Sequence, residues 1–497
     1  MNLATIIDAH PDDATAILSR GRPTTYADLR RQVGAMRGGL AGLGVQPGDR
    51  VAIIAANNWF FVVSYLAALG AGAVVVPLNP SSAPAELQHE LENVGARVAV
   101  VGPSARDAFA ALDRQRLDVQ HVLVPQGLDL DGSTSLEELF TEAPVPIIDR
   151  DEDDLALLMF TSGTAGAPKA AMLTHGNLLA NLRQSHAVDA LKMIDKDVVL
   201  ALMPAFHIFA LNAILGLALH EGAALVLVER FDPVSALADV RDYKVTVVPA
   251  APPVFVAWTA LPGAAPDALG GVRLVLSGGA PLAPDVAAAF RERFDVEIWD
   301  GYGLTEAAPV VTTTLMGGEA RPGSIGRPIP GVEVRLVDTE GDDVPAGDPG
   351  EVWVRGANVF PGYWQDDAAT AAVLNDDGWL MTGDIAVADD DGFLYLVDRS
   401  KDLIIVSGFN VYPAEVEEVL LLHPAIAAAA VVGVEHPYSG EAVKAFVVPE
   451  ADRHLDEDEV IEFCAQHLAR YKCPSSVSFV DSLPRGMAGK LLRRELR

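Results

Sequence analysis

The stretch DRVAIIAANNWFFVVSYLAALGAGAVVVPL, residues 49–78, decides the fold. Asp49–Ala55 and Gly72–Leu78 are short runs rich in β-branched residues, and each has the length of a strand. The apolar segment between them is interrupted by Ser64 and Gly70, so we interpret it as a helix that leads into a buried strand, not as a membrane span. A strand, a helix and a second strand in this order predict a parallel sheet with a crossover helix.

The same alternation recurs along the first three hundred residues. An amphipathic segment, TYADLRRQVGAMRGGLAGLG, occupies residues 25–44 and predicts a helix. Further short β-branched runs lie at Arg97–Gly102, Ala224–Glu229, Val245–Ala250 and Val272–Gly279. The fold class expected from this pattern is α/β, with doubly wound parallel sheets.

Two other sequence patterns follow along the chain. Beyond Arg321, residues 331–338, 350–356 and 392–399 are strand-like and separated by Gly, Asp and Pro turns, which is typical of a small antiparallel or β-barrel-like unit. After Lys401, strand-like and helix-like segments alternate, with a last helix that begins near Leu455. These roughly one hundred residues predict a compact α+β domain.

Composition excludes several classes of function. The chain has 497 residues, half of them hydrophobic, and 68 acidic residues outnumber 36 basic ones, giving a net charge of −32. Such a field disfavours nucleic acid and anionic membranes as partners, although simple surface solvation explains it as well. Cys464 and Cys473 cannot form a disulfide framework, and the N-terminus lacks a signal-peptide pattern. We expect a cytoplasmic protein without stable membrane insertion.

The first stretch that could carry chemistry is FTSGTAGAPK, residues 160–169, directly after the strand-like LALLM. Its hydroxyls and glycines would let backbone N–H groups approach an anion, and its lysine is one of only eight in the chain. The spacing differs from that of a Walker loop, and an ordinary Ser/Gly turn has the same composition. The candidate phosphate-binding residues are Thr161, Ser162, Gly163, Thr164, Gly166 and Lys169.

Three more stretches are ambiguous when each is taken alone. In DGYGLTEAAPV, residues 300–310, the Tyr302 ring could stack on a base and Glu306 could hold magnesium, but a turn with one acid is the simpler explanation. Asp384 and Arg399 suit a ribose diol or phosphate, yet a salt-bridged β meander would contain them too. Lys490, in the terminal PRGMAGKLLRREL, could equally belong to a solvated basic tail.

In this order, however, the four stretches resemble the adenylate-forming superfamily of acyl- and aryl-CoA synthetases, peptide-synthetase adenylation domains and beetle luciferases. The resemblance covers nearly the whole chain, since it includes TYADL at residue 25, SGGAPL at 277, GRPIPGVEVRLVD at 326 and GYW at 362. Members join a carboxylate to ATP and pass the acyl group to a thiol. The resemblance therefore implies an acid–thiol ligase that uses ATP, Mg²⁺ and CoA.

The resemblance also implies roles position by position. Residues 161–169 would cover the β- and γ-phosphates, with Thr161 and Glu306 at the magnesium ion. Lys490 would bridge the α-phosphate and the substrate carboxylate, and its exchange for alanine is expected to slow the first step by on the order of 10²–10³. The remaining nucleotide contacts would be Gly279, Ala280, Asp300, Gly301 and Tyr302 around adenine, Thr305 at the α-phosphate, and Asp384 and Arg399 at the ribose.

By the same resemblance, residues 1–398 form a large domain that binds ATP and the acid, and 399–497 form a smaller mobile domain. Lys401 would be the hinge, unless it merely pairs with a neighbouring aspartate. In relatives the small domain alternates between an adenylating and a thioester-forming pose. In the second pose Ser407, Gly408 and Phe409 would approach the CoA channel, and Lys490 would leave the site.

The acid is harder to predict. The segment ALMPAFHIFALN, residues 201–212, contains no carboxylate to hold an α-ammonium group, which argues against amino acids. The pocket would use His207, residues 250–256, Gly278, Gly279 and residues 307–311. Since these residues are small or aliphatic, a medium- or long-chain fatty acid is the first hypothesis and an aryl acid such as a cinnamate the second; His207 could also be a buried structural residue.

Two alternatives of other classes stay open. One is an acyl-AMP ligase that loads a carrier protein, although we see no insertion of the kind such ligases carry. The other is a non-catalytic nucleotide-binding relative, against which the set Lys169, Glu306, Asp384, Arg399 and Lys490 argues. The chain departs from the family pattern at Ala165, Ala170 and Gly486, which affects loop freedom or one hydroxyl but removes no charged group.

Overall fold

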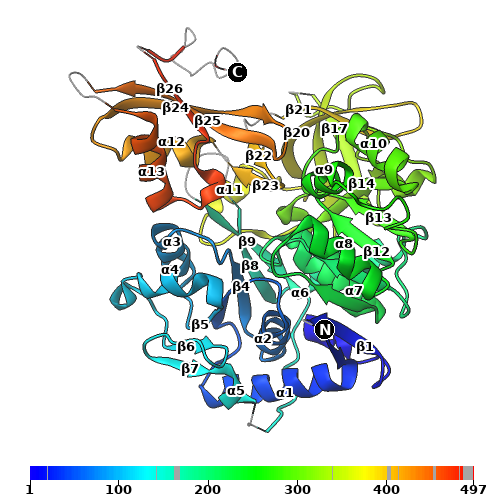
Figure 1. Cartoon of the computed structure of the whole chain (residues 1–497), viewed down its shortest axis with the longest axis vertical. Helices are drawn as coiled ribbons and strands as arrows, with labels where there is room; N and C mark the ends of the chain where they lie inside the picture. Colours follow the sequence, from blue (N-terminus) through cyan, green and yellow to red (C-terminus); the bar gives the residue numbers. More distant parts are fainter. Residues whose placement is uncertain are drawn as a thin grey trace.

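The structure is a computed structural model. It describes residues 1–19, 21–140, 143–161, 168–338, 340–399, 404–411, 413–450, 455–480, 482–484 and 496, and the side chains of these residues except those of 397–399, 410 and 414. Figure 1 shows the whole chain.

The opening stretch forms the expected strand–helix–strand unit. Strand β3 (Arg50–Ile54) and strand β4 (Val74–Leu78) pair in parallel, and helix α2 (Trp59–Gly70) connects them. The side chain of Asn58 caps α2 by accepting a hydrogen bond from the backbone N–H of Phe61. Every residue of α2 after Trp59 is buried, which explains its apolar sequence. Within the described residues, no helix is long and apolar enough to cross a membrane.

Two large sheets make up most of the molecule (Figure 1). The first has the order β19-β9-β8-β4-β3-β5-β6-β7, and its centre is parallel. Its other strands are β5 (Val98–Val101), β6 (His121–Val124), β7 (Ser133–Ser135), β8 (Leu155–Thr161), β9 (Lys169–Thr174) and β19 (Gly362–Tyr363). The nearby helices are α1 (Tyr26–Gly42), α3 (Pro84–Val94), α4 (Arg106–Ala110) and α5 (Leu136–Leu139).

The second sheet has the order β16-β15-β14-β13-β12-β10-β11-β1-β2. Its strands are β1 (Thr15–Ser19), β2 (Arg22–Thr25), β10 (Val198–Ala201), β11 (Ala224–Leu227), β12 (Val247–Ala250), β13 (Leu274–Ser277), β14 (Ile298–Gly303), β15 (Val310–Thr313) and β16 (Arg327–Pro328). Its helices are α6 (His175–His186), the π-helix η4 (Phe209–Gly216), α7 (Leu217–Glu221), α8 (Pro233–Asp242), α9 (Pro252–Ala260) and α10 (Pro284–Phe294).

The strand predictions are confirmed. All six β-branched runs contain a strand, each a few residues shorter than its run, and each of these strands has a parallel neighbour. The antiparallel unit is a four-stranded sheet of order β17-β18-β20-β21, formed by β17 (Val332–Val337), β18 (Gly350–Gly356), β20 (Leu380–Ala388) and β21 (Leu394–Arg399). It carries the short helix α11 (Asp367–Ala371) in the connection before β20.

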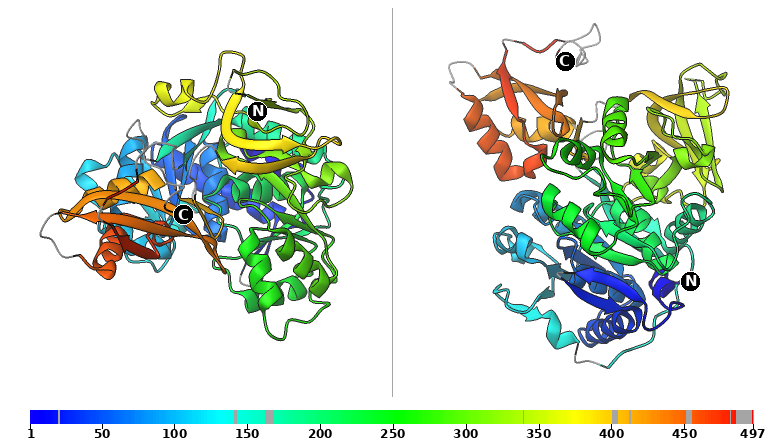
Figure 2. Two further views of the ribbon diagram at one scale, coloured as in Figure 1. Left: turned by 90° about the horizontal axis from the view of Figure 1, so that it is seen from above. Right: turned by 45° about the vertical axis from the view of Figure 1, so that its right-hand side comes forward.

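The C-terminal α+β domain has its own sheet and its own hydrophobic core. Its elements are β22 (Ile404–Val406), β23 (Phe409–Val411), α12 (Pro413–Leu421), β24 (Ile426–His436), β25 (Gly440–Pro449), α13 (Glu457–His467), the 3₁₀ turn η7 (Arg470–Lys472) and β26 (Ser476–Phe479). This domain and the four-stranded sheet both lie at the end of the molecule opposite α1, side by side in the views of Figures 1 and 2. Helix α13 lies against α3 of the first sheet.

Candidate active site

One large cavity, of about 270 Å³, lies at the carboxyl ends of β13 and β14. The second sheet, the four-stranded sheet and the C-terminal domain all contribute to its wall, through Tyr302, Asp384 and Gly408 respectively. The carboxyl ends of parallel strands are where α/β folds bind ligands. The predicted residues in its wall are Thr161, His207, Gly278, Gly279, Ala280, Asp300, Gly301, Tyr302, Thr305, Glu306, Asp384 and Gly408.

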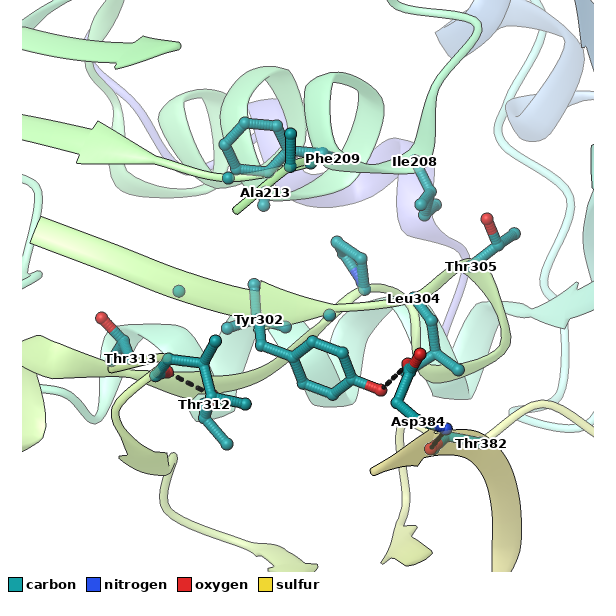
Figure 3. A pocket seen from close by; sticks show the side chains of 18 of the residues that line it. Ile208, Phe209, Ala213, Tyr302, Leu304, Thr305, Thr312, Thr313, Thr382 and Asp384 are labelled. Carbon is teal, nitrogen blue, oxygen red and sulfur yellow. Dashed lines mark hydrogen bonds between the residues drawn. The ribbon is translucent and has the colours of Figure 1, made fainter. Parts of the chain in front are cut away.

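Tyr302 and Asp384 meet directly across this cavity. The Tyr302 hydroxyl donates a hydrogen bond to Oδ2 of Asp384 over 2.7 Å, as Figure 3 shows. Thr382 helps to hold this part of β20, since its hydroxyl accepts from the backbone N–H of Asp384 and donates to the carbonyl of Val352. A ring beside a carboxylate is an arrangement that can bind a base and a ribose diol.

Asp300 lies one strand position before Gly301 and is almost completely buried. Burial raises the pKa of its carboxyl to about 7, although a hydrogen bond from the backbone N–H of Gly301, 3.1 Å away, acts in the opposite direction. The backbone of Asp300 is fixed by the hydroxyls of Thr313 and Thr314. Near neutral pH this carboxyl can therefore be a donor as well as an acceptor of hydrogen bonds.

Glu306 lies in the 3₁₀ turn η5 (Thr305–Ala307), and the hydroxyl of Tyr363 donates to its Oε1 over 2.6 Å. The ammonium group of Lys169 lies 5.5 Å from the centre of the same tyrosine ring and 3.8 Å from Asp366. Strand register places Thr161 opposite Lys169. Tyr363 thus connects the predicted phosphate and metal residues; sequence reasoning missed it, although the GYW motif was a signal.

Magnesium typically uses one or two protein carboxylates, phosphate oxygens and water. Glu306 and Thr161 both line the cavity, and a carboxylate and a hydroxyl are ligands of the type that such an ion accepts. Among the described residues, no group of three His, Cys, Asp or Glu side chains could hold a metal by itself. The donors therefore fit an ion that arrives with phosphate, not a cage made by the protein alone.

His207 is neutral in this environment. Burial, and secondarily the positive charge of Lys472, lower the pKa of its imidazole to about 4. Its Nε2 is buried and has no hydrogen-bond partner within the described part of the chain. The ring packs against both Phe206 and Phe409, each with a centroid separation of 5.2 Å.

The π-helix η4 contributes to the apolar part of the wall, and Figure 3 shows its Phe209 and Ala213 across the cavity from Tyr302. π-Helical turns frequently occur at functional sites because they redirect side chains. The amide of Asn212 fixes η4 by donating to the carbonyls of Leu178 and Ala308 over 3.2 and 2.8 Å. Sequence analysis missed Phe209, because a buried aromatic is a common core residue.

The C-terminal domain reaches the cavity through Gly408. Its φ of +85° is in the left-handed region, and a Cβ there would lie 3.0 Å from the Cβ of Ala251. Phe409 does not line the cavity but packs on His207. Ser407 lies outside the cavity, where its backbone N–H donates a hydrogen bond to the carbonyl of Ser439. Of the expected acyl segments, Pro309 and Val310 line the cavity, whereas none of residues 250–256 does.

Seven predicted site residues cannot be placed in this way. Six lie outside the described residues, and the seventh, Arg399, has a described backbone in β21 but not a described side chain. The six are Ser162, Gly163, Thr164, Gly166, Lys401 and Lys490.

The fold combines two α/β sheets, an antiparallel sheet and a docked C-terminal domain around one cavity with a polar and an apolar side. This is the architecture of an adenylate-forming enzyme. Comparison with known proteins agrees with this. The AMP-binding enzyme model matches residues 3–364, and the AMP-binding enzyme C-terminal domain model matches residues 415–490. The chain belongs to the AMP-binding enzyme family, and the predicted superfamily is confirmed.

Curated relatives align with almost the entire chain. A feruloyl-CoA synthase from an Amycolatopsis species is 40% identical, over 97% of this chain and 95% of its own. A long-chain-fatty-acid–CoA ligase from Yersinia pestis is 37% identical (98% and 91%), and a 4-coumarate–CoA ligase from Pinus taeda is 36% identical (94% and 88%). Like these relatives, the chain is an AMP-forming acid–thiol ligase.

Solved structures show the same fold. An amide bond synthetase from Marinactinospora thermotolerans has a TM-score of 0.89 at 32% identity and covers 100% of this chain and 99% of its own. The o-succinylbenzoate CoA synthetase of Bacillus subtilis, bound with a product analogue, has a TM-score of 0.87 at 29% identity, with coverages of 100% and 98%.

Proposed function

We propose that this enzyme couples ATP cleavage to the formation of a CoA thioester from a compact, apolar carboxylic acid, through an acyl-adenylate. The observation that carries the proposal is a shared cavity, in which the polar pairs Tyr302–Asp384 and Tyr363–Glu306 border the apolar surface of Phe209 and Ala213. Nucleotide and acid can therefore share one chamber.

The polar end suits the nucleotide. Asp384 would accept both ribose hydroxyls, and Asp300 and Tyr302, with the backbone of Gly279, Ala280 and Gly301, would contact adenine. Thr305 would bind the α-phosphate, and Lys169 the outer phosphates. Magnesium held by Glu306 and Thr161 would supply neutralisation of phosphate charge when bound. Arg399 at the ribose and Lys490 at the α-phosphate remain proposals from the family pattern.

No general base is required for the first step, since a carboxylate is already ionised at neutral pH. The difficulty is that two anions must approach each other, so positioning and charge neutralisation carry the catalysis. The described part of the site offers no carboxylate at the apolar end, because Asp300, Glu306 and Asp384 all belong to the polar end. An acid with an apolar body can thus bind with only its carboxylate facing the phosphates.

An aryl acid fits the apolar end best. Its wall contains Phe209, Ala213 and Trp299, and Ser185 at the end of α6 adds one buried hydroxyl. A volume of about 270 Å³ shared with the nucleotide end favours a flat ring over a long chain. The feruloyl-CoA synthase and the 4-coumarate–CoA ligase are named for such acids.

A medium- or long-chain fatty acid is the second candidate. It is favoured by the small residues Ala213, Gly278 and Gly279 in the wall, and by the fatty-acid ligase that is 37% identical over 98% of this chain. We propose CoA as the acceptor in both cases, since these relatives are named CoA ligases or synthases.

ATP–pyrophosphate exchange over a panel of benzoates, cinnamates and C6–C18 fatty acids tests the proposal. The second measurement is thioester formation after CoA is added. We expect the fastest exchange with cinnamates, followed by CoA thioester. Preference for fatty acids would select the second candidate, and exchange without thioester would indicate a carrier-protein acceptor. A complete lack of exchange with every acid would contradict the enzymatic proposal.

A further inference from the structure

A buried ionic cluster joins the two domains, and none of its three residues lines the cavity. Lys472, in η7 of the C-terminal domain, forms ion pairs with Glu86 of α3 and with Oε1 of Glu415, the latter over 2.8 Å. Only 6% of each of these three side chains is exposed. Oε2 of Glu86 also accepts the backbone N–H of Ala469 over 3.2 Å. Both oxygens of the Glu86 carboxylate are therefore bound by groups of the other domain.

The surroundings of Lys472 keep it charged. Burial by itself would lower the pKa of its ammonium group, but the carboxylates of Glu86 and Glu415 outweigh this and raise the pKa above its ordinary value. One turn after Glu86, burial raises the pKa of the Glu90 carboxyl well above its usual range, with Glu86 adding to the effect. The cluster thus combines one cation with carboxyl groups from both domains.

An unbroken chain of ring contacts leads from this cluster to the active site. Tyr471, next to Lys472, packs on Phe409 with a centroid separation of 4.6 Å. Phe409 in turn packs on Phe206 and His207 of the large domain. The residue before Phe409 is Gly408, which forms part of the cavity wall. The position of Gly408 is therefore connected to the Lys472–Glu86 pair through two aromatic rings.

The energy of this pair depends on how the domains are docked. Glu86 and Lys472 are 386 residues apart and belong to different domains, so they can meet only while α13 and η7 lie against α3. Removing one partner of a buried ion pair leaves the other charge unpaired and is strongly unfavourable. Loss of the lysine should consequently shift the equilibrium away from this docked arrangement and affect other arrangements little.

We infer that Lys472 is a positioning residue for the thioester-forming step, which seats the C-terminal domain on Glu86 so that Gly408 completes the cavity wall and Phe409 packs on His207. This inference rests on the proposed two-step function. Lys472 acts through Tyr471 and Phe409 and does not touch the reacting atoms. The adenylation step, which uses a different arrangement of the domains in this proposal, does not require the pair.

The test compares the two half-reactions in Lys472→Met. We expect ATP–pyrophosphate exchange within about threefold of the wild type, and transfer of the acyl group from enzyme-bound acyl-adenylate to CoA slower by on the order of 10²-fold. The acid used is the one with the fastest exchange in the panel. Lys444→Met is the matched control, since Lys444 lies in β25 of the C-terminal domain and its ammonium group lies over the ring of Phe446 in the same strand. Both rates of this variant should stay near those of the wild type.

A double-mutant cycle separates positioning from general damage. Glu86→Gln alters the other domain yet should slow the same half-reaction, and combining it with Lys472→Met should cost much less than the product of the two effects. The triple variant Glu86→Gln, Glu415→Gln and Lys472→Met leaves no unpaired charge among these three residues, so it should recover transfer at least tenfold relative to Lys472→Met.

Equal losses in both half-reactions, or transfer within threefold of the wild type in Lys472→Met, would overturn the inference. The wild type provides the other reference. If it exchanges pyrophosphate with an acid but forms no CoA thioester, the proposed acceptor fails together with this role. If it forms the thioester and only the predicted variant pattern is missing, the proposed function stands and the role of Lys472 does not.

Discussion

The hydroxyl of Tyr363 donates a hydrogen bond to the carboxylate of Glu306 over 2.6 Å, and the ring of the same tyrosine lies beneath the ammonium group of Lys169. Tyr363 belongs to the two-residue strand β19, which pairs with β9 at the edge of the first sheet. One side chain therefore orients the proposed magnesium ligand and contacts the proposed phosphate-binding lysine.

Tyr363→Phe should consequently lower the affinity of the site for Mg²⁺ without abolishing Mg²⁺ binding. Loss of a hydrogen bond to a charged group costs about 1.5–3 kcal/mol, so we expect a roughly 10- to 100-fold loss in pyrophosphate exchange at limiting Mg²⁺, partly restored at high Mg²⁺. Glu306→Gln should lose on the order of 10²–10³ at all concentrations. A titration of exchange rate against Mg²⁺ measures both, and an unchanged Mg²⁺ dependence in Tyr363→Phe would refute the orienting role.

The Tyr302–Asp384 pair predicts an effect on the nucleotide alone. Asp384→Asn should raise the KM for ATP by about 10- to 100-fold, because an amide replaces a charged acceptor, and Tyr302→Phe should raise it by roughly tenfold. The KM for the acid should change little. Tyr395→Phe is the control, since that hydroxyl lies 3.3 Å from Asp389, outside the cavity. Equal changes in both KM values would mean that the pair supports the whole site.

The apolar end predicts a change in acid selectivity. A Cβ on Gly278 would lie 3.0 Å from Cζ of Phe209, so Gly278→Ala should push the ring into the space for the acid. We expect kcat/KM for cinnamates to fall about 10- to 100-fold, with a smaller loss for short unbranched acids and an unchanged KM for ATP. Gly271→Ala, outside the cavity, should be silent. Equal losses for all acids would place the acid elsewhere.

The sequence predicted the two α/β sheets well because central strands such as β4 and β5 are buried on both faces and consist of nearly continuous β-branched runs. Asp384, Tyr302 and Glu306 became candidates only through the order of their motifs, since each is an ordinary turn or strand residue by itself. Tyr363 was missed because its role depends on the pairing of β19 with β9, almost two hundred residues earlier in the chain.

The Lys472–Glu86 pair illustrates the same difficulty at a domain interface. Glu86 follows Pro84 in the first turn of an ordinary amphipathic helix, where an acidic residue suits the helix dipole. Lys472 is the last residue of the 3₁₀ turn η7, shortly after α13. Nothing local distinguishes them from surface charges, and only the docking of the two domains buries them. Such contacts depend on tertiary structure, which local periodicity does not encode.

Asp300 provides a prediction about pH. Its carboxyl has a raised pKa, about 7 in the folded protein against an ordinary value of 3.8, so the folded state retains the proton over a range in which the unfolded chain releases it. The contribution of Asp300 to stability is therefore fully present below about pH 4 and is lost as the pH rises to about 7, by up to about 1.4 kcal/mol per pH unit.

Asp300→Asn, which is neutral at every pH, should not show this loss. Thermal unfolding from pH 4 to 8 should thus give a midpoint difference, variant minus wild type, that increases up to about pH 7 and then levels off. The exposed Asp189→Asn serves as the control, and parallel curves for Asp300→Asn and the wild type would show that Asp300 is ionised throughout this range.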